Sequence, residues 1–259
     1  MSNTNRPADN LVTILEPDSV AAEAFRILRT NIALKDFEGK LKVINVISST
    51  AQESKSTTIL NLAYVFTQLG KKVLIIDLDL RLPSIHKKLR IKNKSGITDV
   101  LSKRTSFNDA VVHYTDKMDI LLSGTKNPYA SEFIQSRTMR NLIAALRERY
   151  DMIFLDCPPV GLVTDGVIAS TLCDGTILCV SIGMNDKKDL EKTRDLLKQF
   201  DVNILGIVLT KVPVMKKYYS KYGGYNKYGY GYGYASYYGS NDNKKKKRDR
   251  KKKKEDIIS

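Results

Sequence analysis

The chain has 259 residues, 42% of them hydrophobic and 27% charged, so it is long enough for one well-filled α/β domain with short appendages. No apolar run approaches the roughly 18 residues that a membrane-spanning helix needs, and the polar start lacks a secretory signal, so we expect a cytosolic protein. The formal net charge of +15 is unevenly placed, because residues 244–256 hold ten Lys or Arg and only three Asp or Glu.

The first part of the chain is expected to hold an arm and a helix. Residues 1–17 lack hydrophobic periodicity and predict a flexible arm. Residues 18–41 predict a helical segment, because Asp18 or Ser19 can cap a helix and the apolar residues that follow recur at helical spacing.

Residues 42–215 alternate between strand-like and helix-like patterns. The apolar runs VINVIS, VLIID, DILLS, MIFLD, TILCVSI and ILGIVLT predict strands. Helical stretches separate several of them, and the first is expected to end at Gly70 with a left-handed cap. Strands that alternate with helices indicate an α/β fold with a mainly parallel central sheet flanked by helices.

The composition changes abruptly after Pro213. Residues 216–243 contain ten of the fourteen tyrosines, interleaved with Gly, Ser, Asn and Lys, and have almost no aliphatic residues. Such a segment cannot build a packed core, so we expect a disordered tail. A polybasic tail, residues 244–259, follows it.

A phosphate-binding loop is predicted where the strand VINVIS gives way to a helix. The loop reads STAQESKST, and Lys-Ser-Thr at a helix N-terminus points backbone N–H groups at an anion. Lys55 would reach the β- and γ-phosphates, and the Ser56 hydroxyl would ligate Mg²⁺. The usual motif has glycine at the positions of Ser49 and Ser54, where serine would cost about 1–3 kcal/mol of backbone strain if the loop keeps its shape.

Three aspartates stand at strand ends. Asp77 ends the run VLIID, Asp79 comes two residues later, and Asp156 ends the run MIFLD. Ligands of open α/β sheets bind at the carboxyl ends of the strands. A single strand-end aspartate often caps a turn, but three beside a phosphate loop suit Mg²⁺-nucleotide chemistry. We therefore predict a P-loop site for a nucleotide and Mg²⁺.

Taken together, these motifs resemble those of the bacterial tyrosine kinases (BY-kinases) of capsule and exopolysaccharide operons, a P-loop family related to MinD and ParA. The matching pieces are the Walker A loop at 54–57, the DxDxR motif at 77–81, the FLDCPPV run with Asp156, an ExxRxxR helix at 23–29 and the tyrosine cluster. Shorter similarities run through RLPSIH, NP and VTDG, so the resemblance spans nearly the whole chain.

Two departures from the family pattern stand out. The loop reads AQESKST where the family usually has PGEGKST. Thr210 stands where relatives often have an asparagine that helps hold adenine, and no base contact is assigned to it.

The resemblance implies a role for each matching residue. Lys55 would stabilise the transferring phosphoryl group, Asp77 would be the base for the tyrosine hydroxyl, and Asp79 and Asp156 would organise Mg²⁺. The expected catalytic residues are Lys55, Asp77, Asp79 and Asp156, and the expected metal ligands are Ser56, Asp79 and Asp156. Nucleotide contacts are expected from Gln52, Glu53, Ser54, Lys55, Ser56, Thr57 and Arg81.

The resemblance also implies contacts between subunits and a set of acceptors. Glu23, Arg26 and Arg29 match the family's subunit-contact motif, although the same stretch also fits a plain amphipathic helix with charge pairs at i, i+3. Phosphorylation would occur in trans between subunits of a ring, on the tyrosines of the cluster: Tyr218, Tyr219, Tyr222, Tyr225, Tyr228, Tyr230, Tyr232, Tyr234, Tyr237 and Tyr238.

The leading hypothesis is an ATP-dependent protein-tyrosine autokinase that regulates polysaccharide assembly. By resemblance, it would form a homo-oligomer and be activated by a transmembrane chain-length adaptor of the polysaccharide co-polymerase type. The polybasic tail would either bind anionic lipid, placing the protein at the inner face of the plasma membrane, or aid solubility. No nucleic-acid partner is expected. The alternatives are a non-kinase ATPase switch like MinD or ParA, and a nucleotide-free scaffold in which Ser54 has abolished binding.

Overall fold

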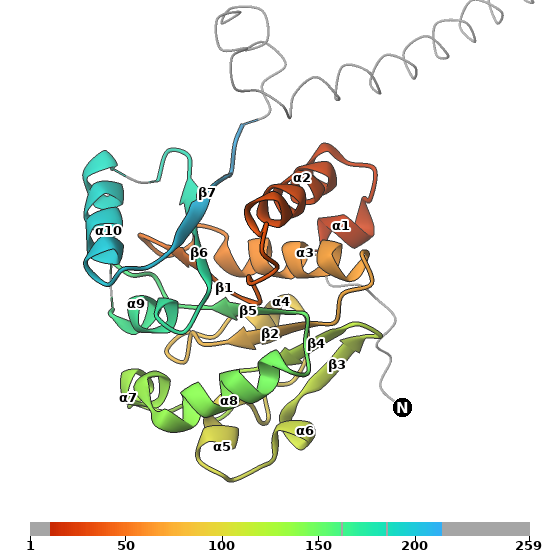
Figure 1. Cartoon of the computed structure of the whole chain (residues 1–259), viewed down its shortest axis with the longest axis vertical. Helices are drawn as coiled ribbons and strands as arrows, with labels where there is room; N and C mark the ends of the chain where they lie inside the picture. The colour runs from red at the N-terminus through yellow and green to blue at the C-terminus, as the bar shows by residue number, and fades with distance from the viewer. Residues whose placement is uncertain (1–10, 162, 185, 214–259) are drawn as a thin grey trace, which may run out of the picture. The chain divides into compact units, whose positions relative to one another are not determined.

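The computed structural model describes residues 11–161, 163–184 and 186–213, and a seven-stranded sheet forms the centre of this part of the chain (Figure 1). The strand order is β3-β4-β2-β5-β1-β6-β7. The strands are β1 (Val43–Ser48), β2 (Val73–Asp77), β3 (Val112–Thr115), β4 (Met118–Leu121), β5 (Met152–Asp156), β6 (Gly175–Ser181) and β7 (Ile204–Thr210). Every pair of neighbours is parallel except β3 and β4, which pair antiparallel.

Helices cover both faces of this sheet (Figure 1). The helices are α1 (Val12–Leu15), α2 (Val20–Lys35), α3 (Lys55–Thr67), α4 (Ile85–Lys88), α5 (Ile97–Leu101), α6 (Phe107–Ala110), α7 (Ala130–Gln135), α8 (Arg137–Arg147), α9 (Asp165–Ser170) and α10 (Lys187–Gln199). Apolar residues of α2, α3 and α4 pack in one core cluster, and those of α5 to α10 pack in a second cluster. Because both faces are covered, every residue of β1, β2 and β5 is buried. This explains why these strands are continuous apolar runs and do not alternate with polar residues.

The predicted mainly parallel α/β fold is confirmed, and all six predicted strands are present. The sequence pattern missed β3, a four-residue edge strand of sequence VHYT that pairs with β4 through an irregular register. Its residues are only partly buried or exposed, so it lacks the apolar run that marked the others. Ser19 is confirmed as the N-cap of α2, since its side chain accepts a hydrogen bond from the Ala22 N–H at 3.1 Å.

The expected flexible arm over residues 1–17 is wrong for its second half. Residues 12–15 form α1, and Leu11 is fully buried in the cluster that α2 and α3 share. The Thr13 N–H and hydroxyl both donate to Asn61 Oδ1 of α3, at 3.0 and 2.9 Å. Tertiary contacts therefore order a segment whose own sequence shows no periodicity.

An ion pair holds the amino ends of β1 and β6 together, opposite the carboxyl ends of the strands, where the predicted site lies. The Asp174 carboxylate accepts two hydrogen bonds from Arg147, at 2.9 and 2.7 Å, and two from the N–H groups of Lys42 and Val43, at 2.8 and 2.7 Å. Burial pushes the pKa of Asp174 upward, but these hydrogen bonds outweigh it and hold the pKa below its ordinary value. The residue thus joins α8 to the starts of β1 and β6.

The chain divides after Val212 into two units, and the described residues fall almost wholly in the first. The predicted disordered tyrosine-rich tail at 216–243 and the predicted polybasic tail at 244–259 lie outside the described residues. Among the described residues, no helix combines the length and apolar character that crossing a membrane would require.

Candidate active site

The predicted phosphate loop joins β1 to α3 and curls through two left-handed residues. Gln52 and Ser54 have φ angles of 62° and 65°, in the region that favours glycine. The strain expected at Ser54 is therefore present, whereas the second left-handed residue is Gln52 and not Ser49. Lys55 opens α3 and, like Ser56, is at most 9% exposed.

The side chain of Glu53 closes this loop from within. Glu53 is fully buried, and its Oε1 accepts hydrogen bonds from the Thr50 N–H at 2.9 Å and the Thr50 hydroxyl at 2.6 Å. Glu53 Oε1 therefore holds the turn, whereas Glu53 Oε2 is buried without a hydrogen-bond partner among the described residues. The predicted contact of Glu53 with the nucleotide stays a prediction.

The predicted aspartates gather at the carboxyl ends of two adjacent strands. Asp77 and Asp156 are register partners on β2 and β5, and both are buried. Burial, followed by the carboxyl groups of Asp156 and Asp79, raises the pKa of Asp77 well above its ordinary value. Burial also raises the pKa of Asp156, to about 6, against the opposing effects of the Lys55 ammonium and the Ser56 hydroxyl. Two adjacent buried carboxyl groups are unfavourable together unless a cation joins them.

The polar atoms of this cluster fit a magnesium ion. Within the described residues, both carboxyl oxygens of Asp156 and Oδ2 of Asp77 are buried without a hydrogen-bond partner. No group of three or more His, Cys, Asp or Glu in the described part of the chain forms a metal cage by itself. Mg²⁺ at a nucleotide needs no such cage, since phosphate oxygens and water supply most of its ligands. Unpartnered hard oxygen donors beside Lys55 and Ser56 are the donor set that such an ion would use.

Comparisons with known proteins agree with this geometry. A family model described as "AAA domain" matches residues 41–201. Tyrosine-protein kinase YwqD of Bacillus subtilis is 36% identical over 222 residues, which cover 85% of this chain and 93% of that protein. The solved chimerical protein CapA2B2 superposes with a TM-score of 0.75 and is 31% identical, covering 79% of this chain and 90% of its own.

The chain belongs to the bacterial tyrosine kinases. A more distant solved structure, the septum site-determining protein MinD of Pyrococcus horikoshii complexed with Mg-ADP, has a TM-score of 0.56 at 26% identity and covers 65% of this chain and 69% of its own. The kinase and MinD thus share the core of the fold.

Two side chains that the sequence motifs did not single out touch the loop helix of this kinase. The Ser56 hydroxyl lies 2.8 Å from the Ser84 hydroxyl, and the Lys88 ammonium donates to the Thr57 hydroxyl at 3.1 Å. Both residues follow the DxDxR motif within the segment RLPSIHKK, so their closeness to that motif was the one available signal. Ser84 therefore holds the hydroxyl that is predicted to bind Mg²⁺.

The arginine of the DxDxR motif makes an ion pair within the kinase. Arg81 Nε donates to Asp165 Oδ2 at 2.8 Å, and the Ser131 hydroxyl hydrogen-bonds the other oxygen of the same carboxylate. This arrangement joins the segment after β2 to the starts of α7 and α9. The predicted contact of Arg81 with the nucleotide stays a prediction. Asp79, also predicted here, is partly buried and accepts the Leu82 N–H at 3.0 Å, and burial raises its pKa.

The ExxRxxR residues of the kinase lie on α2. Glu23 and Arg26 form an ion pair at 2.7 Å near the surface, as the i, i+3 spacing predicted. Arg29 instead donates to the Val65 carbonyl of α3 at 2.7 Å, which fastens α2 to the loop helix. A contact between subunits through these residues remains a prediction.

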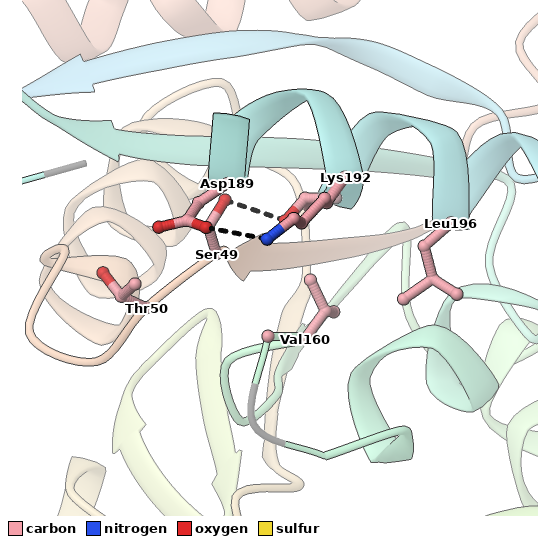
Figure 2. A pocket seen from close by; sticks show the side chains of 8 residues that line it. Ser49, Thr50, Val160, Asp189, Lys192 and Leu196 are labelled. Carbon is pink, nitrogen blue, oxygen red and sulfur yellow. Dashed lines mark hydrogen bonds and ion pairs between the residues drawn. The ribbon is translucent and has the colours of Figure 1, made fainter. Parts of the chain in front are cut away.

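A cavity of about 360 Å³ adjoins the start of the phosphate loop. Figure 2 shows Ser49 and Thr50 of the loop, Val160 from the segment after β5, and Asp189, Lys192 and Leu196 of α10 around it. The Thr193 hydroxyl donates to the Ser49 hydroxyl at 3.0 Å. The cavity therefore lies beside the loop, on the side of α10.

The left-handed serine of this kinase offers a direct test of the loop. Ser54→Gly should stabilise the protein by about 1 kcal/mol, because glycine adopts a positive φ without a steric penalty. It should also tighten Mg-ADP binding about threefold or more, because the backbone can come closer to the phosphates. Chemical denaturation and titration calorimetry measure the two effects.

Lys103→Gly is the matched control for this prediction. Lys103 is exposed and also left-handed, with a φ of 58°, but it lies between α5 and α6, outside the loop. It should gain stability without a change in nucleotide affinity. Equal affinity gains in both variants would contradict a role for Ser54 in phosphate contact.

Proposed function

We propose that the chain is an ATP-dependent protein-tyrosine kinase that phosphorylates its own tyrosine cluster, residues 218–238, and thereby regulates capsular or exopolysaccharide synthesis. The observation that carries this proposal is the buried pair of Asp77 and Asp156 beside Lys55, at the end of a P-loop sheet in a bacterial tyrosine kinase. The tyrosine cluster itself lies outside the described residues.

Each side chain has a chemical task in this proposal. The Asp77 carboxylate accepts the proton of the tyrosine hydroxyl, whose ordinary pKa is near 10, as its oxygen bonds to the γ-phosphorus of ATP and the bond to the leaving ADP breaks. Lys55 offsets negative charge on the phosphoryl oxygens. Mg²⁺, held by Ser56, Asp79 and Asp156, would neutralise charge on the β- and γ-phosphates.

The partners follow from the same reasoning. Glu23 and Arg26 pair near the surface of α2, where they would meet a neighbouring subunit if phosphorylation occurs in trans within a homo-oligomeric ring. The solved relative CapA2B2 is a chimerical protein, which supports a partner protein for the kinase, and we propose that this partner is the activating transmembrane adaptor. The polybasic residues 244–259 would hold the cytoplasmic kinase against anionic lipid at the inner face of the membrane.

A second candidate is an ATPase switch without kinase activity. The similarity to MinD with bound Mg-ADP favours it, because the two share the core that binds nucleotide. The ten clustered tyrosines favour the kinase, because an ATPase that acts by position has no need of them.

Mapping of phosphate after incubation with Mg-ATP separates these functions. Wild-type protein should carry phosphotyrosine within residues 218–238, detected by mass spectrometry, and Lys55→Met should carry none. ADP release without phosphotyrosine, with the adaptor's cytosolic segment present, would establish the switch. Absence of both signals under those conditions would leave only a nucleotide-free scaffold.

A further inference from the structure

The peptide bond between Glu53 and Ser54 lies in the left-handed part of the phosphate loop. It lies between the two left-handed residues, Gln52 and Ser54, each of which disfavours this backbone conformation. The hydrogen bonds from Thr50 to Glu53 Oε1 hold the inner turn, and they do not involve the Glu53 carbonyl. The orientation of the peptide plane needs a further contact.

Thr210, the last residue of β7, provides that contact. Its hydroxyl donates to the Glu53 carbonyl at 3.1 Å, although 157 positions separate the two residues. The Ser181 hydroxyl lies 2.7 Å from the same Thr210 oxygen. Because the single hydroxyl proton of Thr210 goes to Glu53, Ser181 is the donor in this second bond. Ser181 is almost fully buried at the end of β6, so its hydroxyl holds Thr210 in place.

Because the peptide bond is planar, the hydrogen bond to the Glu53 carbonyl also fixes the direction of the Ser54 N–H. In a trans peptide the C=O and the N–H point in opposite directions. No peptide bond among the described residues is cis. A Glu53 carbonyl held toward Thr210 therefore turns the Ser54 N–H away from β7. Ser54 is the N-cap of α3, where backbone N–H groups bind anions.

We propose that Thr210 is a positioning residue of the phosphate loop, which fixes the Glu53–Ser54 peptide so that the Ser54 N–H faces the polyphosphate of the nucleotide. The inference rests on the proposed nucleotide-binding function and adds a residue to it. In a loop that lacks glycine, Thr210 takes over part of the preorganisation, and the carboxyl ends of β6 and β7 become part of the site.

Titration of the full-length chain with Mg-ADP tests this role. Thr210→Val keeps the size and the β-branched shape but removes the hydroxyl, and it should weaken Mg-ADP binding about five- to tenfold. Thr210→Ser keeps the hydroxyl and should bind within about twofold of wild type. Ser181→Ala removes only the supporting donor and should weaken binding by less than Thr210→Val does.

Thr176→Val is the matched control. Thr176 is fully buried on β6, and its hydroxyl has no hydrogen-bond partner among the described residues. The same removal of a hydroxyl at this position should leave the Mg-ADP affinity unchanged. Melting temperatures of all variants monitor the fold.

Kinetics distinguish positioning from a loss of folded protein. Contacts to phosphate are made before and during the reaction, so Thr210→Val should raise the KM for ATP and leave kcat within about twofold. A partly unfolded variant would lose kcat at an unchanged KM, and that result would overturn the inference. Thr210→Val that binds Mg-ADP as wild type does would also overturn it. Wild-type chain that does not bind Mg-ADP would overturn the proposed function and this inference together.

Discussion

Asp77→Asn should lower the rate of tyrosine phosphorylation at least about 100-fold, because an amide cannot accept the proton of the acceptor hydroxyl. Asparagine has nearly the same shape as aspartate, so Mg-ADP affinity should stay within about threefold of wild type. Single-turnover phosphorylation with labelled ATP and titration calorimetry measure the two quantities. Lys55→Met is the contrasting variant and should lose both rate and affinity, since the Lys55 ammonium is predicted to contact the phosphates.

Asp77→Asn should also raise the melting temperature of the nucleotide-free protein. Burial and the neighbouring carboxyl groups raise the pKa of Asp77, so its ionised form disfavours the folded state. A neutral amide removes this penalty, and the melting temperature at pH 8 should rise. An Asp77→Asn variant that phosphorylates at the wild-type rate would show that another group is the base. A variant that loses both activity and thermal stability would indicate a structural role for Asp77.

Asp174→Asn should destabilise the folded chain by about 2 kcal/mol at pH 7, because it weakens four hydrogen bonds, two of them from Arg147. Since the folded-state pKa of Asp174 is depressed, this stabilisation is fully present above the unfolded value of about 3.9 and is lost as the pH falls through the folded value. The gap in unfolding free energy between wild type and variant should therefore shrink in acid. Urea denaturation at several pH values measures it.

Asp195→Asn is the control for this effect. Within the described part of the chain, Asp195 forms an ion pair with the adjacent Arg194, and both side chains are at least half exposed. Such a surface pair contributes little, so the variant should stay within about 0.5 kcal/mol of wild type at every pH. A difference for Asp174→Asn that persists undiminished below pH 3 would show that the effect does not come from the carboxylate charge.

The sequence identified most of the sheet because of where the strands lie. A strand that is buried on both faces is mostly apolar along its length, and β1, β2 and β5 show this pattern in the sequence itself. The exposed edge strand β3 carries no such pattern and went unnoticed. The segment around Leu11 was missed for a related reason, since its burial depends on α2 and α3.

The phosphate loop and the strand-end aspartates could also be identified from the sequence, because each is a short motif of residues close together in the chain. Their order along the chain indicated the bacterial tyrosine kinases before any contact was known. Strand order then made Asp77 and Asp156 direct neighbours, although 79 positions separate them in the chain.

Only the tertiary structure decided which side chains support these motifs. Thr210 contacts the Glu53 carbonyl because β7 pairs with β6 and β6 pairs with β1. Arg81 contacts Asp165 because the segments that follow β2 and β5 come together beyond the ends of these strands. The physical reason is that periodicity in a sequence reports the environment of a residue, buried or exposed. The identity of a partner depends on the packing of strands that lie far apart in the chain.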